Sequence, residues 1–225
     1  MEGRNVSDTE SPQRHLIVPC SLRCCVMSKA KRVFFILLVI LVGTLFSACD
    51  QGKSDPQETE ETVTKVVFSE KILGIAQMSP EDWMSDLMST SEGNYENVYV
   101  NDAGTAVTLE ITDTQKEYWM TSREKLLTDL KSQFAQLGTG YKIEYSDDYS
   151  HIDLYYNLEL DAYEAIRYVM STEVFCANLQ LLSGVEHDQW KVSFNIYNSE
   201  TGKLVTNGNS DTGLSYDASD WEASM

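Results

Sequence analysis

Polar residues alternate with apolar ones in two short segments of the chain, 151–159 and 190–197. A period of two with one apolar set predicts β-strands that bury one side and expose the other. The polar residues expected on the exposed side include His151, Asp153, Tyr155, Asn157, Asn195 and Tyr197. Tyrosine joins an apolar ring to a polar tip, so this set can bind a peptide, a glycan or another protein domain. An ordinary solvated sheet face has the same alternation, and both interpretations stay open.

Carboxylates near His151 raise the question of a metal ion. Asp147 and Asp148 stand close to Asp153 and supply the oxygen ligands that hard cations prefer. The spacing lacks the Asp-x-Asp-x-Asn-Gly start and the terminal Glu of a calcium loop. We therefore expect an ordinary hairpin turn here, with no metal and no other cofactor.

A second histidine lies in Glu186-His187-Asp188, where an imidazole beside a carboxylate is half of an acid and base pair. No nucleophile motif, phosphate-binding glycine loop or His-Glu-x-x-His motif accompanies it. Cys176 falls inside a predicted helix more than two turns from Arg167, so we expect it to pack as a small apolar residue. The sequence therefore assigns no catalytic residue.

A unit of strand, turn, strand and helix occurs twice and positions these residues. The first copy has strands at 97–100 and 106–111. Its helix is expected to begin at a capping box, Thr114 with Glu117, and to end before Gly138. The apolar residues expected to line that helix are Trp119, Leu126, Leu130, Phe134 and Leu137.

The second copy follows directly, with strands at 141–145 and 151–159. Asp161 and Glu164 form another capping box pattern at the start of its helix. The apolar residues expected to line this helix are Ile166, Val169, Met170, Val174, Ala177 and Leu181. A third hairpin, 190–197 with 203–206, has no helix after it.

These units predict an α+β fold with a mostly antiparallel sheet of about six strands and two long helices packed on one face. A strand at 62–68 and a helix from Ser79 and Pro80 to about Met88 precede them, whereas residues 71–77 show no clear period. The outward positions should then share one polar face, made by Thr108, Glu110, Lys142, Glu144, His151, Asp153, Tyr155, Asn157, Lys191, Ser193, Asn195 and Tyr197.

Basic, apolar and small residues follow one another upstream of Cys49, in the order of a secretory signal peptide. Lys29, Lys31 and Arg32 precede the apolar run 33–42. The 16 residues of 33–48 are fewer than the roughly 20 that a membrane span needs, although an uncleaved anchor is the alternative.

Phe46-Ser47-Ala48-Cys49 resembles the lipobox of bacterial lipoproteins. The resemblance implies that the thiol of Cys49 receives a diacylglyceryl group and that the chain is cut before this residue. Two acyl chains are enough for stable anchoring, whereas one holds only marginally. The resemblance thus implies a protein held by Cys49 on the outer side of the bacterial cell membrane.

The chain divides into five parts on these grounds. Residues 1–26 are expected to be an extension ahead of a true start at Met27, and 27–48 a signal peptide. Residues 49–61 are expected to be a polar tether, 62–206 a single α+β domain, and 207–225 a flexible acidic tail.

From Cys49 onward the chain carries 32 Asp and Glu against 11 Lys and Arg. Such a charge opposes adsorption to nucleic acid and to anionic lipid, so we expect no nucleic-acid partner. The only other cysteine in this part is Cys176, so no disulfide can form within it.

We expect a membrane-anchored extracytoplasmic module that binds a protein, peptide or glycan through its open sheet face. One alternative is an enzyme acting on envelope material with His151 or His187 in its site. Another is a structural subunit whose face is covered by a second protein. Clustered acid and histidine groups in a cleft would favour the enzyme, and a flat polar sheet would favour the other two.

Overall fold

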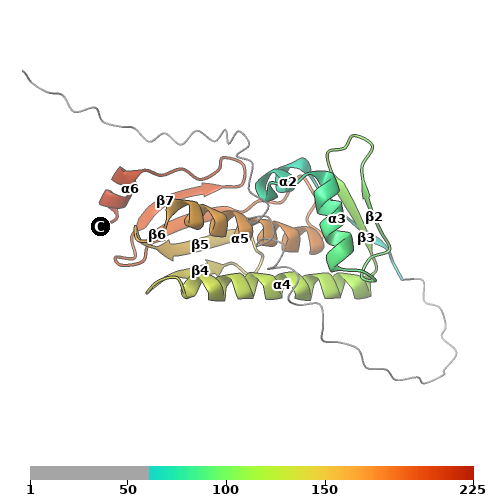
Figure 1. Ribbon diagram of the computed structural model, residues 1–225, viewed down its shortest axis with the longest axis horizontal. Helices are drawn as coiled ribbons and strands as arrows, with labels where there is room; N and C mark the ends of the chain where they lie inside the picture. Colours follow the sequence, from blue (N-terminus) through green and yellow to red (C-terminus); the bar gives the residue numbers. More distant parts are fainter. Residues whose placement is uncertain (1–60) are drawn as a thin grey trace, which may run out of the picture. The chain divides into compact units, whose positions relative to one another are not determined.

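The structure, a computed structural model, describes residues 61–225. The expected extension, signal peptide and lipidation site at Cys49 lie outside the described residues, as does nearly all of the expected tether. The strands are β1 (Thr64–Phe68), β2 (Asn97–Val100), β3 (Val107–Ile111), β4 (Lys142–Tyr145), β5 (His151–Tyr156), β6 (Ser193–Asn198) and β7 (Leu204–Asn209). The helices are α2 (Glu70–Ala76), α3 (Pro80–Thr90), α4 (Asp113–Ala135), α5 (Ala162–Leu182) and α6 (Ala218–Ala223). The predicted α+β class is confirmed (Figure 1).

The strands form two sheets, so the prediction of one six-stranded sheet is wrong. One sheet has the order β1-β3-β2 and is antiparallel throughout. The other has the order β4-β5-β6-β7, and its central pair, β5 and β6, is parallel. The reason is α5, which connects these two strands and returns the chain to the end at which β5 began.

The described residues contain five helices, whereas the sequence predicted two long helices and a shorter one from Ser79, so the predicted set of helices is wrong as well. The expected helix at Ser79 and Pro80 is confirmed, and Ser79 accepts from the amide of Asp82. The sequence predicted neither α6 nor α2, and α2 has seven residues and buries Ile72 and Leu73. Two buried residues in under two turns give no visible period.

The start of α4 differs from the prediction by two residues. Thr112 is the N-cap, and its hydroxyl accepts from the amide of Gln115, whose side chain accepts in return from the amide of Thr112. Thr114 lies inside the helix. Both Thr112 and Thr114 fit the capping-box pattern, so spacing alone did not choose between them. Leu137 lies beyond the end of α4 and is exposed.

The second long helix, α5, is buried on more than the one side that a single apolar stripe would cover. Val169, Ala177 and Leu181 are buried as predicted, whereas Ile166 is exposed. The buried set also contains polar residues, Thr172, Glu173, Asn178 and Gln180. This follows from the position of α5, which contacts α2, α4, β1 and β5.

The inner side of the four-stranded sheet faces these helices. Its residues Ile143, Ile152, Leu154, Tyr156, Phe194 and Ile196 are at most 2% exposed. The helices α4 and α5 pack against each other, and α5 crosses this side of the sheet (Figure 1). The alternate residues of the strands therefore face away from the helices.

The prediction of a flexible tail at residues 207–225 is wrong, because this segment is ordered and packs on the domain. β7 extends to Asn209, and α6 brings Trp221 against Tyr156, with ring centroids 5.2 Å apart. Trp221 is 3% exposed, and Tyr156 donates to the hydroxyl of Tyr216. Burial of these rings holds the segment on the domain. Within residues 61–225 no helix is both long and apolar enough to cross a membrane.

Candidate functional site

The outward side of the four-stranded sheet carries three rows of side chains that run across the strands. Strand register places Lys142, Tyr155, Tyr197 and Leu204 in one row. The next row is Glu144, Asp153, Asn195 and Asn207, and the third is His151, Ser193 and Asn209. We call these eleven residues the polar-aromatic face. Because the helices that contact this sheet meet its buried side, the face is open to solvent among the described residues.

A continuous hydrogen-bond network joins the second and third rows. Nδ1 of His151 lies 2.7 Å from Oγ of Ser193, and Nε2 lies 2.9 Å from Oδ1 of Asp153. Asn195 donates through Nδ2 to Oδ1 of Asp153 (2.9 Å) and to the hydroxyl of Tyr197 (3.1 Å). These side chains hold one another in place, so the surface is arranged before any partner arrives.

The first row is a stack of rings and one cation. Tyr155 and Tyr197 are stacked with centroids 4.7 Å apart and planes at 15°. Nζ of Lys142 lies 3.9 Å from the centroid of Tyr155, on the neighbouring strand β4. Partial burial raises the pKa of Tyr155, although Lys142 opposes this. The ring of Tyr197 on β6 and the ammonium group of Lys142 on β4 cover the ring of Tyr155, which therefore presents its edge to the solvent.

Four other residues expected on this face lie elsewhere. Asn157 follows β5, accepts from Tyr141 and donates to Glu200, apart from the network. Thr108 and Glu110 belong to β3 in the other sheet, and Thr108 is buried because β3 is the central strand. Glu110 pairs with Lys65 at 2.8 Å. Lys191 precedes β6 and pairs with Asp211 at 2.9 Å.

The sequence did not reveal the contribution of β7 to the face. Leu204, Asn207 and Asn209 lie opposite residues of β6, but the prediction ended that strand at residue 206. A register shift beside Tyr197 and the presence of Gly208 interrupt the alternation that would have marked these residues.

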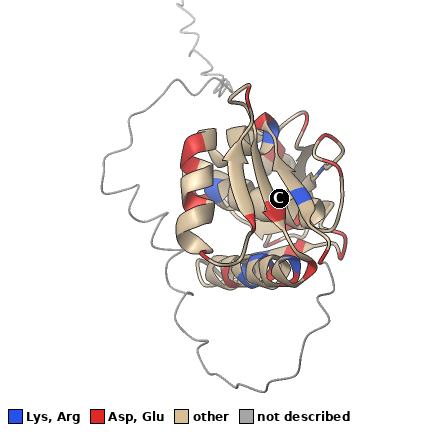
Figure 2. Ribbon diagram, turned by 90° about the vertical axis from the view of Figure 1, so that its right-hand side faces the viewer, with Lys and Arg blue, Asp and Glu red and all other residues tan. Residues whose placement is uncertain are grey.

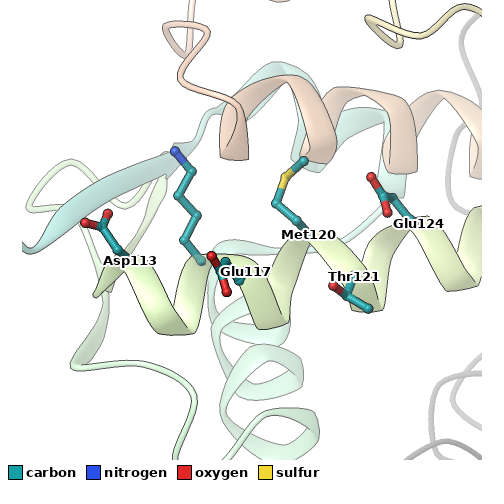
Figure 3. A pocket seen from close by; sticks show the side chains of 6 residues that line it. Asp113, Glu117, Met120, Thr121 and Glu124 are labelled. Atoms are coloured by element: carbon teal, nitrogen blue, oxygen red, sulfur yellow. The ribbon is translucent and has the colours of Figure 1, made fainter.

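Two hollows among the described residues lie away from the face. A hollow of about 560 Å³ lies on α4, where Asp113, Lys116, Glu117, Met120, Thr121 and Glu124 line successive turns of one helix (Figure 3). A smaller one of about 220 Å³ lies between the end of β5 and α6 and includes Asn157, Glu200 and Trp221. Neither of them includes a residue of the polar-aromatic face.

Ser193, His151 and Asp153 resemble a nucleophile, a base and an orienting acid in their contacts. The hydroxyl of Ser193 donates to the carbonyl of Ser150 (3.1 Å), and its backbone amide donates to the same carbonyl (2.9 Å). That amide is therefore not available to stabilise an oxyanion, which acyl transfer requires.

The other candidates for chemistry lie apart. His187 is in an exposed loop, where its carbonyl accepts from Ser69. Cys176 is fully buried as predicted, and burial raises the pKa of its thiol to about 12. Asp148 lies in the predicted hairpin turn, and bonds from Ser146 and Ser150 lower the pKa of its carboxyl to about 2. Across residues 61–225 no three His, Cys, Asp or Glu side chains are arranged to hold a metal ion.

No protein-family model, curated protein or solved structure matches this chain. Its own residues and their geometry are therefore the basis for a functional assignment. The polar-aromatic face offers tyrosine edges, side-chain amides, a carboxylate and an imidazole on one ordered surface. These groups are typical of protein recognition sites.

Proposed function

We propose that the protein is a lipid-anchored module on the outer side of the bacterial cell membrane that binds another protein through its polar-aromatic face. The location rests on the signal peptide pattern and on the lipobox resemblance at Cys49. The polar tether at 49–61 allows the domain to stand off the membrane, since 12 extended residues span at most about 40 Å. The binding role rests on one observation, the ordered and open network centred on Asp153.

The geometry favours a protein partner over a glycan. Sugars stack on exposed aromatic ring faces, but Tyr155 and Tyr197 cover each other, and Lys142 lies over Tyr155. Ring edges with hydroxyl tips and neighbouring amides match the polar surfaces on which proteins associate. A small molecule needs a concave site, and neither of the two hollows includes a residue of the face.

The face is also too polar for a permanent subunit contact. Obligate interfaces resemble a domain core cut in half, whereas Leu204 is the only aliphatic residue among the eleven of the face. A partner that associates and dissociates fits this composition better.

Replacing Tyr155 and Tyr197 by alanine together tests this function. Both side chains are half-buried, so the domain should stay folded, while loss of the central aromatic pair should lower partner binding about tenfold or more. The measurement is recovery of crosslinked or co-purified protein from the membrane fraction. The control is Tyr163→Ala, which removes an exposed tyrosine of α5. Equal recovery from the double variant and the control would remove the proposal.

A further inference from the structure

We propose that the surface recognised by the polar-aromatic face is basic, and that protonated His151 competes with it for Asp153, so that binding weakens on acidification. This inference rests on the proposed function and specifies its partner. It draws on the charge of the domain, the open acceptor atoms of the face and the count of hydrogens in its network.

The charge of the domain selects the sign of the partner. Residues 61–225 carry 28 Asp and Glu against 10 Lys and Arg. Figure 2 shows acidic positions distributed over the helices and loops. Such a charge repels a second copy of the chain and anionic lipid headgroups, and it accelerates encounter with a cationic surface. A basic protein surface is therefore the complementary partner.

The face itself keeps carboxylate oxygens available to that partner. Oδ1 of Asp153 accepts from His151 and Asn195, whereas no described residue donates to its Oδ2. Glu144 lies beside Asp153 in the same row and is exposed, with one oxygen 3.1 Å from Lys142. A Lys or Arg of the partner can thus pair with Asp153 without breaking the network.

The hydrogen bonds of the network depend on the protonation state of His151. The hydroxyl of Ser193 donates to the carbonyl of Ser150, so Nδ1 of His151 must carry a hydrogen to bond its Oγ at 2.7 Å. The carboxylate of Asp153 only accepts, so Nε2 must carry one as well. Nδ2 of Asn195 also lies 3.1 Å from Nε2 of His151, so its two amide hydrogens are shared among Asp153, the hydroxyl of Tyr197 and the imidazole. Only the imidazolium donates to Ser193 and to Asp153 at once while Ser193 donates to Ser150.

When the imidazole of His151 loses one proton, the bonds to Ser193, to Asp153 and from Ser193 to Ser150 can no longer all form. Neutral His151 can keep its bond to Asp153, but the hydroxyl of Ser193 must then turn from Ser150 toward Nδ1. The charged group that contacts the imidazole is Asp153 on β5. Glu144 on β4 lies opposite Asp153, the hydroxyl of Tyr197 on β6 accepts from Asn195, and Asp148 in the turn before β5 accepts from Ser150, the residue before His151.

A positive charge on His151 would thus act on Asp153 from within the face. Histidine changes its charge between about pH 5 and about pH 8. When the imidazole of His151 is positive, it offsets the charge of Asp153 and repels a cation of the partner. When it is neutral, Asp153 and Glu144 together attract that cation.

Hexalysine, a defined cationic peptide, tests the inference on the intact domain by amide chemical shifts. We expect it to shift residues of β4, β5 and β6 at about pH 7.5, and to bind several-fold more weakly at about pH 5.5. Asp153→Asn should weaken binding about fivefold, whereas Asp102→Asn, which removes an exposed carboxylate in the turn after β2, should not. Glu144→Gln is a second variant in case Asp153→Asn fails to fold. His151→Gln should abolish the pH dependence.

Equal losses from Asp153→Asn and Asp102→Asn, or a pH dependence that persists in His151→Gln, would overturn the inference. Shifts spread over the acidic residues of α3 and α4 would overturn it as well. The proposed function fails separately, through unchanged partner recovery in the double tyrosine variant. If that variant loses its partner while hexalysine shifts no residue of the face, the proposed binding function is retained and the basic partner is rejected.

Discussion

Glu173 is an acidic residue buried where its ionised form is disfavoured. It lies in the middle of α5, is 6% exposed, and its Oε1 has no hydrogen-bond partner among the described residues. Burial raises the pKa of its carboxyl from 4.5 to about 7, with Asp211 adding to the effect and Lys71 opposing it. The folded protein therefore holds a proton that the unfolded chain releases at lower pH.

This proton makes stability depend on pH. Between about pH 4.5 and about pH 7 the unfolded state binds fewer protons than the folded state at this site, so stability falls as the pH rises, by about 3 kcal/mol. Glu173→Gln should remove that fall and should stabilise the protein at about pH 8 relative to the parent chain. Urea unfolding across this pH range measures it. Glu186→Gln, in an exposed loop, should leave the fall unchanged. A difference between parent and Glu173→Gln that is the same at every pH would contradict this account.

At the scale of elements, the start of α4 distinguishes two threonines that the sequence makes equivalent. Thr112 caps the helix through the amide of Gln115, whereas Thr114 lies within the first turn, and its hydroxyl bonds Glu61 at the surface. Thr112→Ala should destabilise the domain by about 1 kcal/mol, because it removes the cap. Thr114→Ala should change stability by less than about 0.5 kcal/mol. Thermal unfolding of the two variants measures the difference. Equal losses of stability in the two variants would contradict the assignment of the cap to Thr112 alone.

The elements also show where sequence patterns suffice. Alternation in His151–Tyr156 and Ser193–Asn198 predicted both central strands and their polar sides, because one side is buried. The same alternation is compatible with either direction of pairing, so the parallel pair of β5 and β6 could not be predicted. The separate location of Glu110 was hidden for a related reason, since no local pattern shows which strands share a sheet.

The site was predictable in its residues but only partly in their contacts. The prediction placed His151, Asp153, Asn195 and Tyr197 on one face, and register brings them together. Asn157 has the right spacing but lies past the end of the strand, where other partners take its amide. The network itself depends on which residues of β5 and β6 are opposite each other, and this register is a property of the tertiary structure.

At the scale of the whole molecule, the anchor and the domain have separate determinants. Cys49→Ser should abolish incorporation of radioactive palmitate and prevent cleavage before residue 49, because it removes the thiol that we propose as the lipid acceptor. Cys176→Ser removes a buried thiol and should leave labelling unchanged. Metabolic labelling followed by fractionation measures both. Continued labelling of Cys49→Ser would contradict the lipoprotein assignment.

The central claim is that the polar-aromatic face meets another protein while the chain is in place on the cell. Asn207 is an exposed member of the face, and Tyr118 on α4 is a comparably exposed residue outside it. A photo-crosslinking amino acid at each position, activated in intact cells, compares the two surfaces directly. We expect a discrete adduct of higher mass from position 207, lost when Tyr155 and Tyr197 are both alanine, and none from position 118. No adduct at 207, or the same adducts at both positions, would contradict the account.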